Sequence, residues 1–477
     1  MRLAVPVIRR AFKLQARMRR NFWDGSLNIL MSIRLSAQRG TYIKRHSIGK
    51  MFAESKGQEL FMERTDLAGT ADLRNFVHDS KRQMVELESL LTRCKALAPE
   101  NGGDGELEKC TALEKWLCEN GFSGGNVKIE RFDAPDCRVS SKIRPNLVVT
   151  VPGKSDDFSV WVMAHLDVVP CGDLSLWSGD PWTVVEKDGK LYGRGVEDNQ
   201  QGLVSAVFAA LAYIKNGAVP AHTVKLLFAA DEEVGSEYGV IWLLKNTALF
   251  RKNDLVLIPD GGDSKGETIE IAEKNLLWLK VHVHGKQAHG SRPDQGNNAC
   301  TAASDLLLRL HNLEQFFNRK DALFEPPVST FQPTMRLANV SGINIIPGED
   351  TFCMDCRILP CYTLDEVLSA VEQCCTQIEE EYGVEVCYEI PQKSESPATP
   401  KDSPVVKKLS SAIYRAHGIQ ARTIGIGGGT VGAELRREGI ACAVWSTLDE
   451  CAHMPDEYCI IENIVKDAET LIEFFSE

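Results

Sequence analysis

Five groups of residues along this 477-residue chain could bind metal ions. The first is His165, which follows the apolar run 160–164 and stands two residues before Asp167. The other four groups contain Asp198, the triplet Asp231-Glu232-Glu233, Asp260 and, after Glu450, His453. Two imidazoles and three carboxylates form a mixed nitrogen and oxygen ligand set, which suits zinc, with cobalt or manganese as alternatives. The set contains no thiol, which argues against a structural zinc site.

Five ligands are more than a single catalytic zinc ion normally takes from a protein. They match two divalent ions about 3.5–4 Å apart that share a bridging carboxylate. Taken singly, each residue has an ordinary explanation: Asp198 as a helix N-cap, the acidic triplet as a solvated turn, Asp260 as a turn residue and His453 as a surface histidine. Their joint occurrence after successive strands favours the metal site.

The elements that must position these residues alternate between strands and helices. Short apolar runs predict strands at 146–151, 160–164, 224–230, 255–258 and 441–447, and helical spacing predicts helices at 203–214 and 402–417. Residues 70–122 are also predicted to be helical, with a break at 99–105. This alternation predicts an α/β fold with a mostly parallel sheet and helices on both faces. In such sheets, ligands bind at the carboxyl ends of the strands.

The pattern changes near residue 275. We expect a strand at 276–284, a helix at 299–313, strands at 334–340 and 351–359, a helix at 364–382 and a strand at 384–390. This β-α-β-β-α-β order is that of a complete small α/β sandwich. The sequence therefore predicts a zinc-binding catalytic domain, residues 66–275 plus 395–477, interrupted by an inserted lid or dimerisation domain, residues 276–394.

Charge is unevenly distributed along the chain. Residues 1–50 hold twelve of the 54 basic residues and one of the 66 acidic residues, so the remainder has 42 basic and 65 acidic residues. An acidic body of this kind repels nucleic acid, and no apolar run is long enough for a transmembrane helix. Residues 1–65 are expected to form a basic extension with little stable structure. Its first part resembles a mitochondrial transit peptide, or is translated ahead of a start at Met51.

The 15 cysteines are scattered, and no secretory signal is evident. This usage is typical of a reduced compartment and predicts a cytoplasmic protein, with a mitochondrial location as the alternative. The pair Cys353 and Cys356 has the spacing of a redox or zinc motif. We interpret these two residues as structural thiols, because residues 351–359 alternate like a strand and no second pair lies at a suitable distance.

Four motifs resemble the dinuclear zinc exopeptidase and deacylase family. They are Met-Ala-His-Leu-Asp-Val-Val-Pro-x-Gly-Asp (163–173), Trp-Ser-Gly-Asp-Pro-Trp (177–182), Gly-Arg-Gly-Val-Glu-Asp-Asn (193–199) and Asp-Glu-Glu-Val-Gly-Ser (231–236). That family includes succinyl-diaminopimelate desuccinylase, acetylornithine deacetylase, aminoacylase, glutamate carboxypeptidase and dipeptidases. The resemblance covers roughly residues 75–475, in order and with matching spacing.

The resemblance implies a role for each candidate ligand. His165 would bind one metal ion and His453 the other, Asp198 would bridge them, and Glu233 and Asp260 would each complete one of the two sites. Asp167 would orient His165, and Glu232 would be the general base. The peptide bond between Asp198 and Asn199 is a candidate for the cis geometry often found at this place in the family.

Further residues are implied as contacts of the substrate. His289 would reach across a homodimer, formed through the inserted domain, and donate a hydrogen bond to the developing oxyanion in the partner's site. Asn344 would contact the substrate, and Gly427, Gly428, Gly429 and Thr430 would bind its α-carboxylate through backbone N–H groups. Arg357 would either hold a substrate carboxylate or form an ion pair with Asp355.

The predicted activity is metal-dependent hydrolysis of an amide bond in a small substrate with a free carboxylate. In the family, desuccinylases and aminoacylases usually carry Glu at the position of Asp260, whereas dipeptidases and acetylornithine deacetylase carry Asp. The resemblance therefore favours a dipeptidase or other exopeptidase. The alternative is an N-acyl amino acid deacylase of the acetylornithine deacetylase or succinyl-diaminopimelate desuccinylase type. A non-catalytic binding protein on the same fold is disfavoured, because none of the five ligands or Glu232 is missing.

Overall fold

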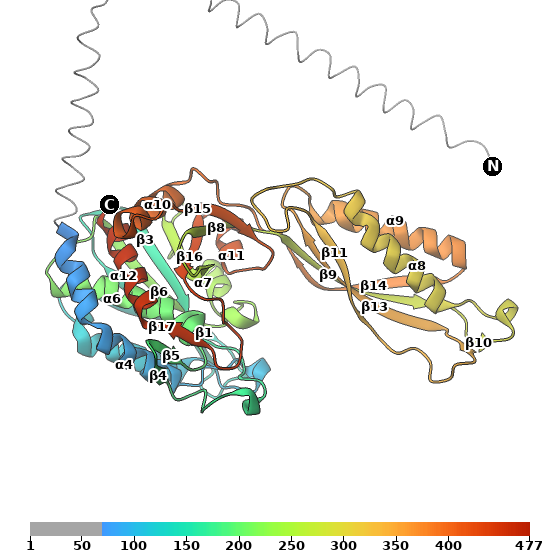
Figure 1. Ribbon diagram of the computed structural model, residues 1–477, viewed down its shortest axis with the longest axis horizontal. Helices are drawn as coiled ribbons and strands as arrows, with labels where there is room; N and C mark the ends of the chain where they lie inside the picture. The colour runs from blue at the N-terminus through green and yellow to red at the C-terminus, as the bar shows by residue number, and fades with distance from the viewer. Residues whose placement is uncertain (1–68) are drawn as a thin grey trace, which may run out of the picture. The chain divides into compact units, whose positions relative to one another are not determined.

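The apolar run around Val160 forms a central strand of an eight-stranded sheet (Figure 1). The computed structural model describes residues 69–477. The strand order is β1-β2-β6-β3-β7-β16-β8-β15. The strands are β1 (Lys128–Pro135), β2 (Ile143–Val151), β3 (Ser155–His165), β6 (His222–Ala229), β7 (Leu255–Asp263), β8 (Thr268–Glu273), β15 (Arg422–Ile426) and β16 (Cys442–Thr447).

The centre of this sheet is parallel, as the sequence predicted. β3 pairs in parallel with β6 and β7, β7 with β16, and β8 with β15. β1 and β2 extend one edge in antiparallel fashion, and β16 meets β8 antiparallel. β1, β8 and β15 were not predicted. Half of the residues of β1 are charged, and its position at the edge of the sheet explains the weak apolar signal.

Helices cover both faces of the large sheet, which confirms the predicted fold class. Val160 and Val162 of β3 face one layer, which contains α4 (Lys81–Thr92), α5 (Leu107–Leu117), α6 (Gly202–Lys215), α10 (Pro404–His417) and α12 (Ile461–Ser476). Trp161 and Met163 face the other layer, with α7 (Val240–Asn246) and α11 (Gly432–Arg437). Residues 69–79 are also helical, and η1 (Pro99–Asn101) lies in the predicted break. No helix among residues 69–477 is long and apolar enough to cross a membrane.

α6 lies at the centre of its layer. All residues from Gly202 to Tyr213 are buried, because the helix packs between the sheet and α12. The hydroxyl groups of Ser205 and Tyr213 donate hydrogen bonds to carbonyl oxygens of Ile464 and Ile472 in α12. Full burial of each large apolar side chain contributes about 1.5–3 kcal/mol, so this layer is a major source of stability.

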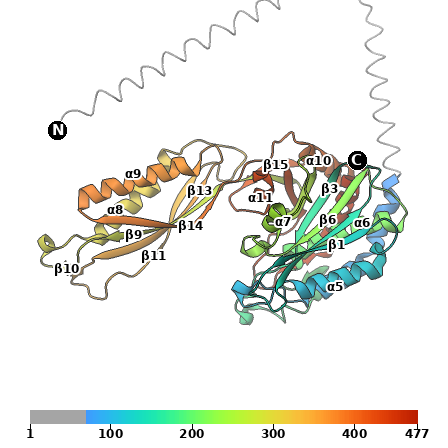
Figure 2. The same cartoon turned by 180° about the vertical axis from the view of Figure 1, so that it is seen from behind.

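A second, four-stranded antiparallel sheet carries α8 (Ala299–His311) and α9 (Leu364–Tyr382) on one face (Figure 2). Its order is β11-β13-β9-β14, with β9 (Asn275–His284), β11 (Thr330–Arg336), β13 (Glu349–Ile358) and β14 (Glu385–Ser394). The predicted β-α-β-β-α-β order is confirmed, although β11 begins four residues earlier than the predicted 334. A capping box at Thr363 starts α9, and Gly383 in the left-handed region ends it.

The two sheets have separate apolar cores. Odd-numbered residues of β9, such as Leu277 and Val281, are buried against α8 and α9, in a cluster distinct from those of the large sheet. The exact domain boundaries at 275 and 395 stay a prediction. The predicted extension, residues 1–65, lies outside the described residues.

A small three-stranded sheet corrects one sequence-based expectation. We expected Asp198 to follow a strand of the parallel sheet, but the strand before it, β5 (Lys190–Tyr192), pairs with β4 (Val185–Lys187) and β17 (Tyr458–Ile460). The pairing of Tyr192 with Tyr458 joins the segment before Asp198 to the segment after His453.

Candidate active site

Five side chains converge in two groups that share one carboxylate. Nε2 of His165 lies 3.0 Å from Oδ1 of Asp198 and 3.8 Å from Oδ1 of Asp260. Nε2 of His453 lies 3.0 Å from Oδ2 of Asp198 and 3.1 Å from Oε2 of Glu233. Each group could hold one metal ion, and the two oxygens of Asp198 serve one group each. The structure thus brings together all five candidate ligands, and it groups Asp260 with His165 and Glu233 with His453, a pairing that the sequence left open.

Each ligand has a distinct structural support. His165 is the last residue of β3, and Asp260 lies in β7, which runs on to Asp263. Asp198 sits in an irregular helical turn, η4 (Val196–Gln201), just before α6, and the Asp198–Asn199 peptide bond is cis, as predicted. Glu233 follows β6, and His453 lies in the loop between β16 and β17.

The geometry and chemistry of these groups fit divalent ions. Zinc bonds to nitrogen and oxygen of about 2.0–2.1 Å place neighbouring tetrahedral ligand atoms about 3.3 Å apart. The separations of 3.0 and 3.1 Å around Asp198 are close to that value. Oε1 of Glu233 is buried and has no hydrogen-bond partner among the described residues. An unsatisfied buried carboxylate oxygen is unfavourable without a cation.

Neighbouring groups shift the pKa values of the shared carboxylate, Asp198, and of His453. Burial alone would raise the pKa of Asp198, but hydrogen bonding to His165 and His453 outweighs burial and holds the pKa well below its usual range. Hydrogen bonding to Asp198 and Glu233 raises the pKa of His453 to about 10. A metal ion would replace these protons as the partner of the carboxylates.

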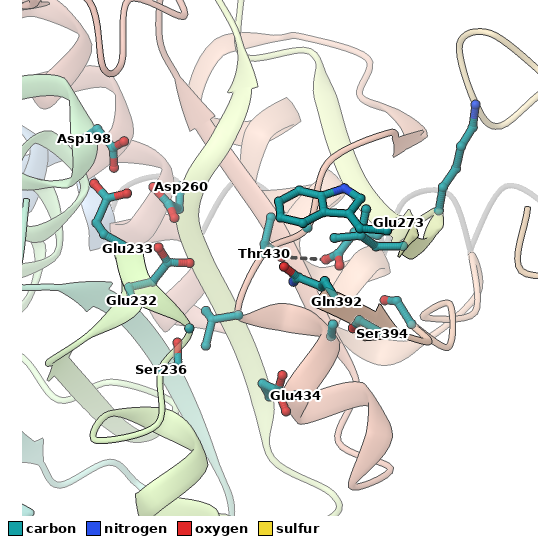
Figure 3. Close-up of a pocket in the computed structure, with 18 of the residues that line it drawn as sticks. Asp198, Glu232, Glu233, Ser236, Asp260, Glu273, Gln392, Ser394, Thr430 and Glu434 are labelled. Carbon is teal, nitrogen blue, oxygen red and sulfur yellow. Dashed lines mark hydrogen bonds between the residues drawn. The ribbon is translucent and has the colours of Figure 1, made fainter. Parts of the chain in front are cut away.

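Glu232 stands beside the ligands without joining either group. Its pKa is raised to about 8, first by burial and then by the nearby carboxylates of Glu233 and Asp167, while the charge of His165 opposes the shift. In Figure 3 its carboxylate points toward the same space as those of Glu233 and Asp260. This position suits a group that exchanges a proton with a reactant near the ions.

Asp167 has a broader structural role than the predicted one. Its carboxylate lies 3.5 Å from Nδ1 of His165, but the shorter contact of that nitrogen, 3.0 Å, is with the backbone carbonyl of Asp167. The two carboxylate oxygens instead accept hydrogen bonds from the backbone N–H groups of Glu232 and Glu233, at 3.0 Å each. Asp167 therefore supports the turn that carries the candidate base as well as the imidazole.

Two supporting residues were missed at the sequence level. Asn199 donates from Nδ2 to Oδ1 of Asp260 at 2.8 Å, and its own Oδ1 accepts from the backbone N–H of His165. Glu457 is buried and accepts hydrogen bonds from the backbone of Glu197 and Asp198. Asn199 belongs to the motif Gly-Arg-Gly-Val-Glu-Asp-Asn (193–199), so its position next to Asp198 could have indicated a supporting role. Nothing in the local sequence distinguishes Glu457 from an exposed glutamate.

A cavity of about 470 Å³ adjoins the ligands (Figure 3). Its walls come from both sheets, since Leu276, Trp278, Gln392 and Ser394 belong to the four-stranded sheet. Among the described residues that line it, six are carboxylates and two are cationic or imidazole groups. The acidic residues are Asp198, Glu232, Glu233, Asp260, Glu273 and Glu434, and the other two are Lys274 and His453.

The glycine-rich loop is only partly at this cavity. Gly429 and Thr430 line it, while Gly427 and Gly428 precede them along the loop after β15. The hydroxyl group of Thr430 donates to Oε1 of Glu273 at 2.6 Å, so this side chain anchors the loop. A contact of Thr430 with substrate would therefore use its backbone N–H.

Arg357 is engaged within the protein. Its guanidinium donates to both oxygens of Asp355, at 2.7 and 3.0 Å, and to the carbonyl oxygen of Gly427, at 2.8 Å. Arg357 does not line the cavity. This is the ion pair that the sequence left open as an alternative, and it also ties the inserted sheet to the glycine-rich loop.

His289 and Asn344 lie together, but away from the cavity. His289 is exposed in the short strand β10 (Ala288–His289), which pairs with β12 (Ile345–Ile346), and Gly290 N–H donates to the carbonyl oxygen of Asn344. Neither residue lines the cavity of its own chain. They stand beyond the end of β9 that is opposite to its junction with β8.

Comparison with known proteins gives a consistent result. The profile described as Peptidase family M20/M25/M40 matches residues 161–477. An uncharacterized metallohydrolase of Methanocaldococcus jannaschii is 39% identical, over 83% of this chain and 99% of that protein. Succinyl-diaminopimelate desuccinylase of Wolinella succinogenes is 29% identical, over 62% of this chain and 78% of that protein. The crystal structure of aminopeptidase PepT from Bacillus cereus superimposes with a TM-score of 0.66 at 18% identity, covering 83% and 98% of the two chains.

Proposed function

Since this chain belongs to peptidase family M20/M25/M40 and is a metal-dependent hydrolase, we propose that it cleaves an amide bond in a small peptide with a free carboxylate, as a dipeptidase or other exopeptidase. Support for hydrolysis comes from the two ligand groups that share Asp198, with Glu232 beside them. Support for the substrate class comes from the charge of the adjoining cavity.

Two divalent ions, most simply zinc, with cobalt or manganese as alternatives, would occupy the two groups. His165 and Asp260 would hold one ion, Glu233 and His453 the other, and Asp198 both. When bound, the ions would supply Lewis acidity that makes water easy to deprotonate near neutral pH. Glu232 would take the proton from the attacking water and later deliver it to the leaving amine nitrogen. Asp167 would hold Glu232 in place through its backbone N–H.

The charge of the cavity favours a dipeptide over an N-succinyl amino acid. A succinyl group brings a second carboxylate, which requires its own cationic partner. Lys274 already donates to the carbonyl oxygens of Pro326 and Val328, and the carboxylates in the cavity wall outnumber its cationic groups. One carboxylate on the substrate can instead be met by the backbone N–H groups of the loop 427–430.

A deacylase remains the second candidate because of the sequence relationship to succinyl-diaminopimelate desuccinylase. A substrate panel separates the two functions: dipeptides, N-acetyl amino acids and N-succinyl amino acids, each assayed with the chain reloaded with zinc, manganese or cobalt. We expect kcat/KM for the best dipeptide to exceed that for any N-acyl amino acid by about tenfold or more, equivalent to about 1.4 kcal/mol. A preference for N-succinyl substrates would reject the dipeptidase assignment.

We also propose that two copies associate through the inserted domain, residues 276–394, so that His289 and Asn344 complete the partner's site. The ten residues of β9 span about 33 Å, so these two residues are remote from the junction with the large sheet. The neighbouring segment exposes three large apolar side chains, Met335, Leu337 and Ile343, as an interface would require.

All fifteen cysteines are free thiols, which supports a reduced compartment such as the cytoplasm.

A further inference from the structure

The turn that carries Glu232 and Glu233 begins with an unusual backbone conformation. Asp231 has φ 67° and ψ 21°, in the left-handed region that favours glycine. Glu232 and Glu233 follow in a single 3-10 turn, η5 (Glu232–Val234), which ends at Gly235. A non-glycine residue in this region is less stable by about 1–2 kcal/mol, so surrounding contacts must hold it there.

One set of contacts comes from Asp167, after β3, which accepts hydrogen bonds from the backbone N–H groups of Glu232 and Glu233. A second set comes from β2, which pairs with β6 on the side away from β3. β2 runs antiparallel to β6, with Leu147 opposite Phe228. Extending that register by three residues places Arg144 opposite Asp231. The strand pairing thus directs a cation to the first residue of the turn.

Arg144 is fully buried and is surrounded by carboxylates. Its Nη2 lies 3.0 Å from Oδ1 of Asp231, and the same guanidinium forms a two-pronged pair with Glu106 and lies 3.5 Å from Asp136. Glu106 is itself fully buried, so the guanidinium is fixed from behind. The contact with Asp231 is an ion pair without a hydrogen bond, because Oδ1 of Asp231 accepts none among the described residues, so the fixed guanidinium holds this carboxylate by its charge.

The other oxygen of Asp231 closes the loop that follows. Oδ2 accepts a hydrogen bond from the backbone N–H of Tyr238 at 3.1 Å. Asn146, two residues after Arg144 in β2, donates to the carbonyl oxygen of the same Tyr238 at 2.9 Å and accepts from Ala230 N–H at 3.1 Å. Arg144 and Asn146, near the start of β2, therefore hold both ends of the segment 230–238.

We propose that Arg144 is a positioning residue of the active site, which acts through the carboxylate of Asp231 to fix the direction in which Glu232 and Glu233 project. It touches neither the candidate ligands nor the cavity. The effect of Arg144 on activity rests on the proposed hydrolase function, whereas its effect on metal binding does not. A displacement of the turn by about 1 Å would misplace a base and a ligand together, and displacements of that size lower rates by up to about a hundredfold.

The test uses substitutions at Asp231 that separate backbone conformation from the side-chain contact. Asp231→Gly removes the strain of the positive φ but also removes the contact with Arg144, and Asp231→Asn keeps a residue that tolerates this φ while removing the charge. We expect both variants to lower kcat by about tenfold to a hundredfold with KM changed less than about twofold, and to weaken binding of one of two zinc ions in equilibrium dialysis. Asp188→Gly is the matched control: Asp188 also has a positive φ, 53°, but is exposed in the β4–β5 turn.

A substitution of Arg144, the other partner of the contact, completes the experiment. Arg144→Lys retains a buried cation that cannot contact Glu106 and Asp231 in the same geometry. We expect it to reproduce the effects of Asp231→Asn, and the double variant to be no worse than either single one, because both remove the same contact. If Asp231→Gly has wild-type kcat and binds two zinc ions as tightly as the Asp188→Gly control, the proposal is wrong. If the wild-type protein hydrolyses no tested substrate, the zinc-binding measurements alone decide whether Arg144 positions the turn.

Discussion

Two adjacent glutamates at the end of β6 have different surroundings. Glu233 approaches His453 and leaves one oxygen unsatisfied, whereas Glu232 faces the cavity without contacting either histidine ligand. Adjacent residues in a tight turn point in different directions, so one can bind an ion while the other exchanges protons. This division of roles gives the first prediction.

Glu232→Gln should lower kcat by about a hundredfold to ten-thousandfold, the range associated with a general base. The amide has nearly the same shape, so two zinc ions should still bind. Glu233→Gln should instead lose affinity for one ion. Steady-state kinetics and metal analysis of both variants check this. Equal loss of metal from the two variants would contradict the assignment of Glu232 as base.

Asp167→Asn should impair catalysis more than metal binding. An amide offers one acceptor oxygen, so one of the two backbone N–H groups of the turn loses its partner, which costs about 1–3 kcal/mol. We expect reduced kcat with near-normal zinc content, whereas His165→Ala should lose one ion. Zinc content and thermal unfolding of the two variants provide the measurement. A similar loss of zinc in both would show that Asp167 is needed for binding itself.

At the residue scale, the sequence predicts which candidate ligands converge, because several of them stand where strands end. His165 and Glu233 sit where short apolar runs stop, and this is visible without a structure. The supporting charges are not visible, because they act across large sequence separations. Glu457 meets Asp198 from 259 residues away, and the identity of such a partner depends on the folded arrangement.

At the scale of elements, the start of α6 is in close contact with β7. A Cβ atom on Gly202 would lie 2.6 Å from the carbonyl oxygen of Pro259, the residue before the ligand Asp260. The absence of a side chain at this position lets the helix approach the strand. The fully buried helix α6 thereby fixes the distance between Asp198, just before it, and Asp260.

Gly202→Ala should separate these two elements. We expect unfolding stability to fall by about 1–3 kcal/mol, as overpacking in a core typically does, and zinc affinity to fall at the group formed by His165, Asp198 and Asp260. Chemical denaturation and zinc titration check both effects. Gly179→Ala is the control, since a Cβ there has nothing within 4 Å, and it should change neither quantity. Wild-type zinc affinity in Gly202→Ala would show that the helix does not set the ligand spacing.

Prediction of elements from the sequence succeeded for long, periodic segments and failed for short, polar ones. The helix 364–382 was predicted to the residue, because its apolar stripe and its terminal Thr363 and Gly383 are all local signals. β4, β5 and β17 have three residues each, and β17 pairs with β5 across more than 250 residues of sequence. Local periodicity cannot encode such a pairing.

At the scale of the whole molecule, the position of His289 predicts complementation between subunits. His289→Ala and Glu232→Gln should each have little activity alone. If His289 serves the partner's site, mixing the two variants under conditions that allow subunit exchange should restore about a quarter of wild-type activity, because half of the dimers are mixed and each has one intact site.

Light scattering of wild type and of each variant measures whether they form the proposed dimer. The control is a mixture of Glu232→Gln with Glu233→Gln, which alter the same site and should restore nothing if each site uses both residues from one chain. Absence of recovery in the first mixture, with exchange demonstrated, would reject the role of His289 in the partner's site.

The order of the ligands along the chain has a consequence for biosynthesis. His165, Asp198 and Asp260 all precede the inserted sheet, whereas His453 follows it and is succeeded by β17 and α12. Because a chain emerges from the ribosome from its N-terminus, the three ligands of the first group are synthesised long before His453, although Asp198 still lacks the support of Glu457. In a nascent chain, Asp198 and Glu233 of the second group would then await His453. Occupancy of the second group would therefore report that synthesis has passed His453.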